Sequence, residues 1–451
     1  MVRVRARVAA RVMTVRGLLV RFASAGGAVV VLSLVTPAEF GLLAVVRSLT
    51  TIVEQGTELG LVWPLLRQRD EPTREEYGAL AGAQVLLLMA VLAIAAVWLP
   101  AETRWWLLAV VTAMFTITLG TGARIRLERE LRYSRIAIAE VSGLLLHTTV
   151  LIAFLMAGKF RIGVFVAQIA ITLYLNCFLY ASSPGPLPTL HVSRVLRMVK
   201  SSAGYTTAFL VMVAREQALA LIVAALFGLQ AAGTWAFAAR LGKFLQFTYE
   251  GFARVGVPAA ARLAPDRSAL RQLAAESLTG AALGAIPAAA IVVFGLPAVP
   301  LIWPQWTTAV PLAQIYVPSE AIAGVMAAAL GPIALALFGW RAVLIEHAVP
   351  LLIACTSFVW LWYVRLNALE DAAIAVQIGA VAALIAITDA KVRPAWNREM
   401  TRIGMAVASG LAVYVVGRFV GLQPAIIAVA ASAILAAWLW RPWMDYMGVG
   451  R

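Results

Sequence analysis

The chain has 451 residues, of which 62% are hydrophobic and only 13% charged, and its formal net charge is +15. A soluble globular protein is about 45–50% apolar and about 25% charged, so a water-soluble core cannot bury this excess. The composition therefore predicts an integral membrane protein. The two cysteines, Cys177 and Cys355, lie in separate apolar runs. No metal-ligand spacing and no P-loop is present, so the sequence predicts neither a metal site nor nucleotide hydrolysis.

Apolar runs of about 20 residues or more predict transmembrane helices, because a helix of that length crosses the hydrocarbon core. The chain contains fourteen such runs, at approximately residues 13–36, 39–65, 77–99, 105–122, 136–157, 162–181, 199–227, 230–261, 272–296, 306–337, 342–364, 372–388, 403–417 and 422–440. We therefore expect an all-α integral membrane protein with about 14 transmembrane helices. The connecting loops leave no room for a soluble catalytic domain, so we predict that the protein is not an enzyme and has no catalytic residue.

The loops between these runs alternate in their content of basic residues. If the Arg-rich amino terminus is cytoplasmic, every second loop is also basic, including the loop at 123–135. These segments hold 26 of the 37 basic residues, and the intervening loops hold only 5. Because Lys and Arg concentrate on the cytoplasmic side of membrane proteins, the pattern predicts that both termini are cytoplasmic. The net charge is then a consequence of topology, and we expect no nucleic acid partner.

An internal repeat relates the two halves of the chain. A shift of 196 residues aligns Arg47 with Lys243 and Glu54 with Glu250. Six spans separate the two copies, and an even number keeps them in the same orientation, which predicts two six-helix halves in a parallel pseudo-twofold repeat. The expected organisation is an N-terminal half at 1–181, a cytoplasmic linker at 182–198, a C-terminal half at 199–388, and two extra helices with a cytoplasmic tail at 389–451.

Each half carries a stripe of charged residues at helical spacing. The stripes consist of Arg47, Thr51, Glu54 and Glu58 in the first half, and of Arg240, Lys243, Phe247, Glu250 and Arg254 in the second. Ions on a membrane helix must face the bundle interior or a water-filled cavity, so two equivalent stripes predict one cavity between the halves. The alternative interpretation is that Arg and Glu on neighbouring turns neutralise each other and fix helix packing. Three further acids are interpreted as helix contacts or interfacial side chains: Glu140, Glu320 and Glu346.

The run "VMVAREQALALIVAALFG" (211–228) contains two more charges, Arg215 and Glu216. A charge at the centre of a membrane helix costs about 2.5–3.5 kcal/mol even on lenient insertion scales, so both are candidate cavity residues. Adjacent residues point about 100° apart on a helix. We therefore expect Arg215 to face the cavity and Glu216 to face a basic residue on an adjoining helix.

Several segments resemble the Wzx-type polysaccharide flippases of the multidrug/oligosaccharidyl-lipid/polysaccharide (MOP) exporter superfamily. The stretch "LSLVTPAEFGLLAVVRSLTTIVEQGTELGLVWPLLRQRD" is similar to the family's amino-terminal helices, which are joined by a Leu-Thr-Pro-acid-aromatic-Gly turn. Further similar segments are "LERELRYSRIAIAEV" (127–141), "FGLQAAGTWAFAARL" (227–241) and "PQWTTAVPLAQIYVP" (304–318). The resemblance covers roughly residues 15–390. It departs from the family at Arg215-Glu216-Gln217-Ala218, where many relatives carry an Asn and an Asp.

This resemblance implies a transporter that flips an undecaprenyl-pyrophosphate-linked oligosaccharide across the bacterial inner membrane for surface polysaccharide biosynthesis, by alternating access. The implied pyrophosphate-binding bases are Arg47, Arg215, Arg240, Lys243 and Arg254. The cavity acids Glu54, Glu58, Glu216 and Glu250 then either orient these bases or bind coupling ions. No cofactor is expected apart from an H⁺ or Na⁺ gradient. The expected partners are the lipid bilayer, the lipid-linked oligosaccharide, a polysaccharide polymerase and glycosyltransferases.

Three other functions are compatible with parts of the sequence. A MATE-like cation-coupled exporter of small molecules would favour acids and aromatics in its cavity, whereas bases here balance or exceed acids. A membrane glycosyltransferase or ligase would need catalytic groups in an outer loop, and the longest ones, near 296–305 and 365–371, offer only Arg365, Glu370 and Asp371. A non-transporting scaffold would leave the two charged stripes unexplained.

Overall fold

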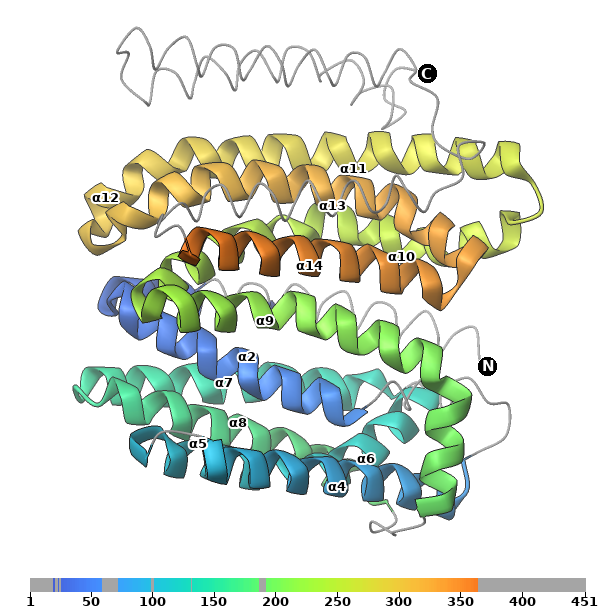
Figure 1. Ribbon diagram of the computed structural model, residues 1–451, viewed down its shortest axis with the longest axis horizontal. Coiled ribbons are helices and arrows are strands. Elements are labelled where there is room, and N and C mark those ends of the chain that lie inside the picture. Colours follow the sequence, from blue (N-terminus) through green and yellow to red (C-terminus); the bar gives the residue numbers. More distant parts are fainter. Residues whose placement is uncertain are drawn as a thin grey trace, which may run out of the picture. The chain divides into compact units, whose positions relative to one another are not determined.

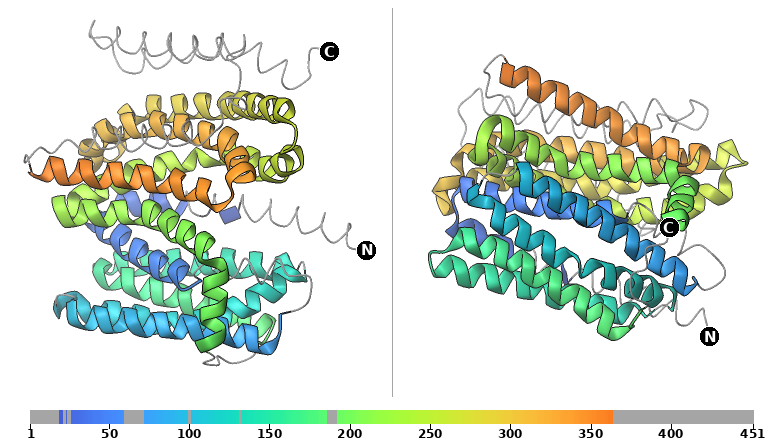
Figure 2. Two further views of the ribbon diagram at one scale, coloured as in Figure 1. Left: turned by 45° about the vertical axis from the view of Figure 1, so that its right-hand side comes forward. Right: turned by 60° about the horizontal axis from the view of Figure 1, so that its bottom comes forward.

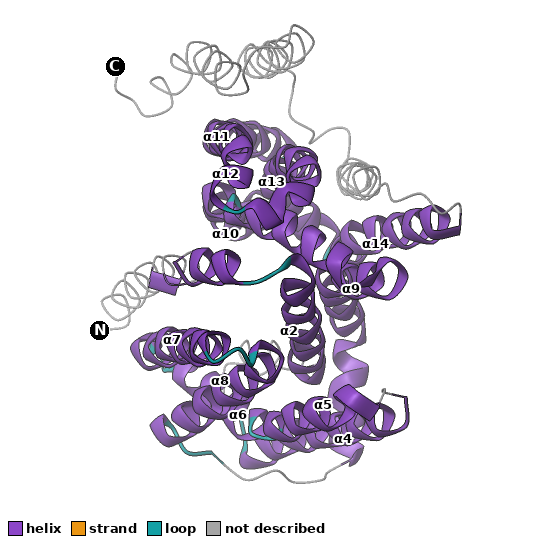
Figure 3. Cartoon of the chain, turned by 90° about the vertical axis from the view of Figure 1, so that its left-hand side faces the viewer, coloured by secondary structure: helices purple, strands orange, loops and turns teal. Residues whose placement is uncertain are grey.

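The computed structural model describes residues 26–58, 72–98, 101–130, 132–185 and 192–363, together with residues 19, 20 and 23. Every regular element in these ranges is a helix (Figure 3). Helices satisfy all their backbone hydrogen bonds within one segment, which lipid requires. The predicted all-α fold is therefore confirmed. The spans predicted at 372–388, 403–417 and 422–440 lie outside the described residues, and the count of fourteen remains a prediction.

Eight helical segments in the described ranges are long and apolar enough to cross a membrane: Arg74–Ala93, Leu108–Arg129, Tyr133–Met156, Phe160–Ser182, Thr206–Phe244, Arg267–Ile302, Pro304–Phe338 and Trp340–Tyr363. They coincide with eight of the predicted apolar runs to within several residues, apart from the run at 199–227, which is merged with the start of the next. Neither α2 (Pro37–Glu58) nor α10 (Gln246–Leu263) is among them. These two helices carry most of the predicted charged stripes, and their polar side chains lower their hydropathy.

The chain forms two compact units, Met1–Leu221 and Ile222–Arg451, called unit 1 and unit 2 below. The described helices of unit 1 are residues 26–34, α2, α4 (Arg74–Trp98), α5 (Ala101–Met114), α6 (Ile117–Arg129), α7 (Tyr133–Met156), α8 (Phe160–Ser182) and the first part of α9 (Val192–Phe244). The antiparallel helices α7 and α8 lie side by side in every view (Figures 1 and 2). A tight turn joins them, in which Gly158 has φ 69° and the Lys159 amide donates to the Phe154 carbonyl at 2.9 Å. Glycine suits this position because it adopts positive φ without a steric cost.

Capping interactions set where several helices begin. At α2, Thr36 is the residue before Pro37, and its backbone amide donates to the Glu39 carboxylate at 2.8 Å. The same arrangement starts α4, where the Thr73 amide donates to Glu76 at 2.7 Å. These are capping boxes, in which a Thr and an acid three residues later satisfy helix-start amides. The family-like Thr-Pro-acid turn is therefore a helix-start signal.

Polar side chains connect α4, α6 and α8 inside unit 1. Buried Gln84 of α4 donates from Nε2 to the Thr121 hydroxyl of α6 at 3.0 Å. Asn176 of α8 is buried against Gly120 of α6 so closely that any side chain at Gly120 would overlap it. Interhelical hydrogen bonds and small residues are what hold helices together where lipid removes the hydrophobic driving force.

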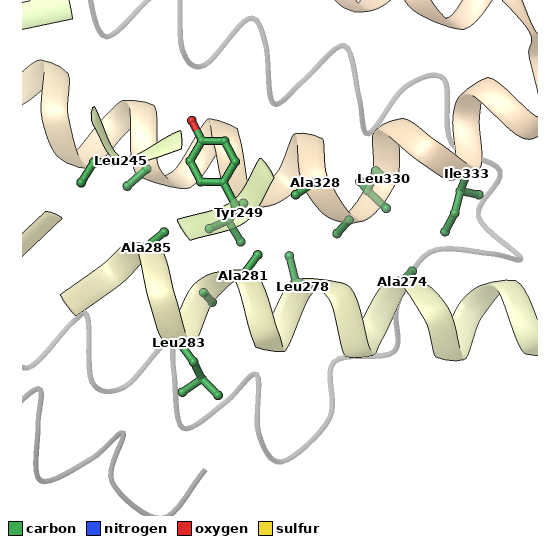
Figure 4. Close-up of a cluster of buried hydrophobic side chains, with 14 of the residues drawn as sticks. Leu245, Tyr249, Ala274, Leu278, Ala281, Leu283, Ala285, Ala328, Leu330 and Ile333 are labelled. Atoms are coloured by element: carbon green, nitrogen blue, oxygen red, sulfur yellow. The ribbon is translucent and has the colours of Figure 1, made fainter. Parts of the chain in front are cut away.

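Unit 2 contains the rest of α9, then α10, α11 (Arg267–Gly295), η1 (Leu296–Ala298), α12 (Val299–Ile302), η2 (Pro304–Ala309), α13 (Val310–Phe338) and α14 (Trp340–Tyr363). Its core lies among α10, α11 and α13, where many contact residues are alanines (Figure 4). Tyr249 of α10 fills the space beside Gly324 of α13. Aromatic contacts tie α9 to α13 and α14, since the Trp235 ring lies 5.4 Å from Tyr316 and 5.3 Å from Phe358.

The structure differs from the predicted elements at two places and agrees with them at a third, Gly228. Helix α9 begins at Val192, inside the predicted linker 182–198, of which residues 186–191 lie outside the described part. Within α9, Gly228 has φ 87° and ψ 174°, which breaks the helix where two spans were predicted to meet. The span predicted at 230–261 is interrupted at Leu245, whose amide bonds to Gly242 three residues back rather than four. The domain boundaries deduced from the repeat remain predictions.

Candidate functional site

The charged stripe of α2 begins near the middle of that helix. Arg47 is exposed and Glu54, two turns later, is half-buried. The hydroxyl of buried Thr50 donates to the Arg47 carbonyl at 2.9 Å, so this polar group is satisfied within its own helix. The side chain of Glu58 lies outside the described part of the structure. The stripe therefore places a guanidinium and a carboxylate two turns apart on one helix, and the residue that carries the carboxylate is the more enclosed of the two.

Glu54 belongs to an ionic cluster that spans three helices of unit 1. Attraction to Arg124 of α6 and to Arg47 acts on its carboxylate, as does repulsion from Glu140 of α7. Arg124 Nε contacts Glu128 Oε1 at 3.0 Å, one turn along α6, and Arg124 Nη2 lies 3.9 Å from Glu140 Oε1. We call Arg47, Glu54, Arg124, Glu128 and Glu140 the unit 1 ionic cluster.

Three members of this cluster were absent from the predicted site. The sequence placed Arg124 in a basic loop at 123–135, but α6 continues as a helix to Arg129. Glu140 was interpreted as a helix contact or an interfacial side chain, and it does bridge α7 to α6. The detectable signal was the i, i+4 spacing of Arg124 and Glu128, which places them on one helix face. The contact between α6 and α7 had no such signal.

The second stripe lies in unit 2 and crosses from α9 to α10. Arg240 and Glu250 are half-buried, and Lys243 is exposed. A Cβ at Gly242 would meet Glu320 Cγ at 3.1 Å, so the α13 acid packs against α9 beside Gly242. The shift of 196 residues that relates Arg47 to Lys243 also relates Arg124 to Glu320. Unit 2 therefore has an acid where unit 1 has a base.

The remaining predicted residues are on α9 and α10. Arg215 is half-buried in the unit 1 part of α9. Its neighbour Glu216 is exposed and makes no ion pair in the described ranges, so the expected basic partner is not found there. The side chain of Arg254 is outside the described part. The structure thus brings Arg47 and Glu54 into one cluster and leaves the joint action of all five bases as a prediction.

These side chains are suited to an anionic ligand. Guanidinium and ammonium groups bind phosphate through charge-assisted hydrogen bonds, which are stronger than neutral ones. In the parts of the chain that the structure describes, no group of three or more His, Cys, Asp or Glu side chains is arranged to hold a metal ion.

The fold is that of the MOP superfamily transporters. It is similar to a structure of the lipid II flippase MurJ in an inward closed conformation, with a TM-score of 0.68 and 12% identity, covering 97% of this chain and 99% of that chain. It is also similar to an inward-facing multidrug resistance MATE family transporter of the MOP superfamily, with a TM-score of 0.60 and 11% identity, covering 87% and 94%. An outward-facing multidrug resistance MATE family transporter matches at a TM-score of 0.51 and 13% identity, covering 89% and 95%.

The family is defined by sequence as well. Residues 30–311 match a family model described as polysaccharide biosynthesis protein, and the chain belongs to that family. No curated protein matches the chain. The resemblance found in the sequence is therefore confirmed at the level of family and fold, and the protein is a multi-pass membrane protein.

Proposed function

We propose that this protein is a flippase that moves an undecaprenyl-pyrophosphate-linked oligosaccharide from the cytoplasmic to the outer leaflet of the bacterial inner membrane, with both termini in the cytoplasm. The observation that carries the proposal is the pair of charged residues Arg47 and Glu54 on one face of α2, in a chain of the polysaccharide biosynthesis family. The MOP fold supports it, because a protein described as a lipid II flippase has the same fold.

The proposed mechanism assigns one part of the route to each part of the substrate. The pyrophosphate is bound by Arg47, Arg215, Arg240, Lys243 and Arg254, because a concentrated anion needs fixed positive charge in a low-dielectric setting. The oligosaccharide follows the polar residues of the charged helices, and the lipid tail remains among apolar helices. Alternating access moves the head group. Glu54, Glu58, Glu216 and Glu250 orient the bases or bind coupling H⁺ or Na⁺, and a polymerase and glycosyltransferases act on either side of this step.

The test is export in a strain whose only copy of the gene encodes the full chain. Alanine at Arg47, Arg215, Arg240 and Lys243 together should abolish surface polysaccharide and cause the lipid-linked unit to accumulate on the cytoplasmic face. The matched controls are Arg161→Ala and Arg341→Ala, which remove exposed arginines outside the predicted site. Normal surface polysaccharide in the fourfold variant, at normal protein levels, would overturn the proposal. Altered resistance to small cationic molecules with unchanged polysaccharide would instead favour a MATE-like exporter.

A further inference from the structure

Arg124 is more exposed than either of its two ion-pair partners in the unit 1 ionic cluster, Glu128 and Glu140. Its side chain is 44% exposed, whereas Glu128 is 19% exposed and Glu140 is 18% exposed. An anion that approaches these pairs therefore meets the guanidinium before either carboxylate. The two more enclosed acids balance its charge.

The two carboxylates hold Arg124 with different strength. Glu128 contacts Nε at 3.0 Å, within hydrogen-bond distance. Glu140 lies 3.9 Å from Nη2, which is an ion-pair distance but longer than a hydrogen bond of about 2.7–3.2 Å. Glu128 thus positions the guanidinium, and a phosphate oxygen can replace Glu140 at Nη2 without breaking a hydrogen bond between the two.

We propose that Arg124 is a further phosphate-binding residue of the transport path in unit 1, positioned by Glu128 and shielded by Glu140 until a pyrophosphate-bearing lipid displaces that carboxylate. This proposal rests on the proposed flippase function and extends its binding site to α6. Arg124 lies five residues before the end of the candidate span Leu108–Arg129, or about 7–8 Å along the helix axis. Arg47 lies seven residues before Glu54 in the sequence, which is about 10 Å along the axis of α2. With the 123–135 segment on the cytoplasmic side, as the proposed topology has it, Arg124 is the first phosphate contact and Arg47 the second.

The charge balance of the cluster suits a temporary contact. The cluster contains three carboxylates and two guanidiniums, and two of the carboxylates pair with Arg124. An anion bound among these groups meets repulsion as well as attraction. A site on a transport path must bind well enough to admit its substrate and weakly enough to release it.

The experiment measures binding of farnesyl pyrophosphate, farnesyl phosphate and farnesol to the purified full chain in lipid nanodiscs. Arg124→Ala should weaken binding of farnesyl pyrophosphate about tenfold, the effect of losing one charge-assisted contact. Arg124→Lys should recover part of the loss. Glu140→Gln should tighten binding severalfold, because it removes the competing anion, and this gain should vanish in the Arg124→Ala background. Farnesol binding should be the same in every variant, which also reports that the variants are folded.

Arg132→Ala is the matched control. Arg132 is near the same end of α6, is 47% exposed and pairs with Glu130 at 3.2 Å. Its removal should change farnesyl pyrophosphate binding less than twofold. Equal binding by Arg124→Ala and the wild-type protein would overturn the inference, as would weaker binding by Glu140→Gln, the result of a purely structural bridge. If the wild-type protein does not prefer farnesyl pyrophosphate over farnesol, the proposed function itself fails. If binding depends on Arg47 but not on Arg124, only this inference fails.

Discussion

The backbone amide of Thr36 donates to the Glu39 carboxylate at 2.8 Å, and the Glu39 amide donates in return to the Thr36 hydroxyl at 3.3 Å. This reciprocal pair starts α2, the helix that carries Arg47 and Glu54. Thr36→Ala should destabilise the protein by about 1 kcal/mol, because a helix-start amide loses its acceptor. The midpoint of thermal unfolding in detergent measures the effect. Thr73→Ala should behave similarly at α4, where the same box occurs.

The control for this prediction is Ser33→Ala. Ser33 is an exposed hydroxyl residue whose side chain donates to the Val30 carbonyl within its own helix, so it caps nothing. An effect of Thr36→Ala no larger than that of Ser33→Ala would show that the box does not stabilise α2.

Two glycines of α13 should respond oppositely to alanine. A Cβ at Gly324 would overlap the ring of buried Tyr249, whereas a Cβ at Gly331 would meet only the Glu346 carboxylate at 3.8 Å, an ordinary contact. Gly324→Ala should therefore destabilise unit 2 by about 1–3 kcal/mol, the usual cost of overpacking. Gly331→Ala should be neutral or stabilise by up to about 1 kcal/mol, because alanine favours the helix.

A rescue variant tests the cause of the Gly324 effect. Tyr249→Leu removes the overlapping ring and should recover part of the stability lost in Gly324→Ala, while Tyr249→Phe keeps the ring and should not. Thermal unfolding of the two double variants measures this difference. Equal unfolding midpoints would place the strain somewhere other than the ring.

Arg126 of α6 should hold the end of α8 in place. Its guanidinium donates from Nη2 to the Ser183 carbonyl at the end of α8 and lies 5.7 Å from the Tyr77 ring centre. Arg126→Ala should cost about 1.5–3 kcal/mol, the range for a hydrogen bond that involves a charged group. Hydrogen exchange of residues 180–185 should speed up selectively, since the last carbonyls of α8 lose their donor. Arg161→Ala, which removes an exposed arginine at the start of α8, should leave that exchange unchanged.

Asp266 should make stability depend on pH in acid. Hydrogen bonds from the Ala269 amide, the Ser268 hydroxyl and the Ser268 amide lower the pKa of this carboxyl, which caps α11. A lowered folded-state pKa means that the contribution is present above the unfolded value, about 3.9, and is lost as pH falls through the folded value. As the pH falls below about 4, the unfolding midpoint should therefore fall more steeply in the wild-type protein than in Asp266→Asn.

The asparagine variant is the appropriate comparison for Asp266 because it removes the titration and keeps a good capping side chain. Parallel pH profiles for the two proteins would mean that Asp266 does not contribute to acid sensitivity.

The positions of the helices were predictable because the bilayer restricts the backbone conformations that an apolar segment can adopt. An apolar run such as 136–157 or 342–364 must be helical in lipid, and the structure has α7 and α14 there. The break at Leu245 was not predictable in this way. The interruption of the run at 230–261 depends on backbone hydrogen bonds over three residues instead of four, which the amino-acid composition does not signal.

The candidate site likewise has features that were predictable from the sequence and features that were not. A spacing of seven residues is two helical turns, so Arg47 and Glu54 could be placed on one face of a helix from the sequence alone. The proximity of Arg124 to Glu54 and the ion pair between Arg124 and Glu140 of α7 became visible only in the folded protein. The contact between α6 and α7 depends on the turn between them and on the rotation of each helix about its axis. The periodicity of a single apolar run encodes neither the turn nor the rotation. In the sequence, Arg124 therefore looks like part of a basic loop and Glu140 looks like a structural acid. The two side chains meet only when the helices pack.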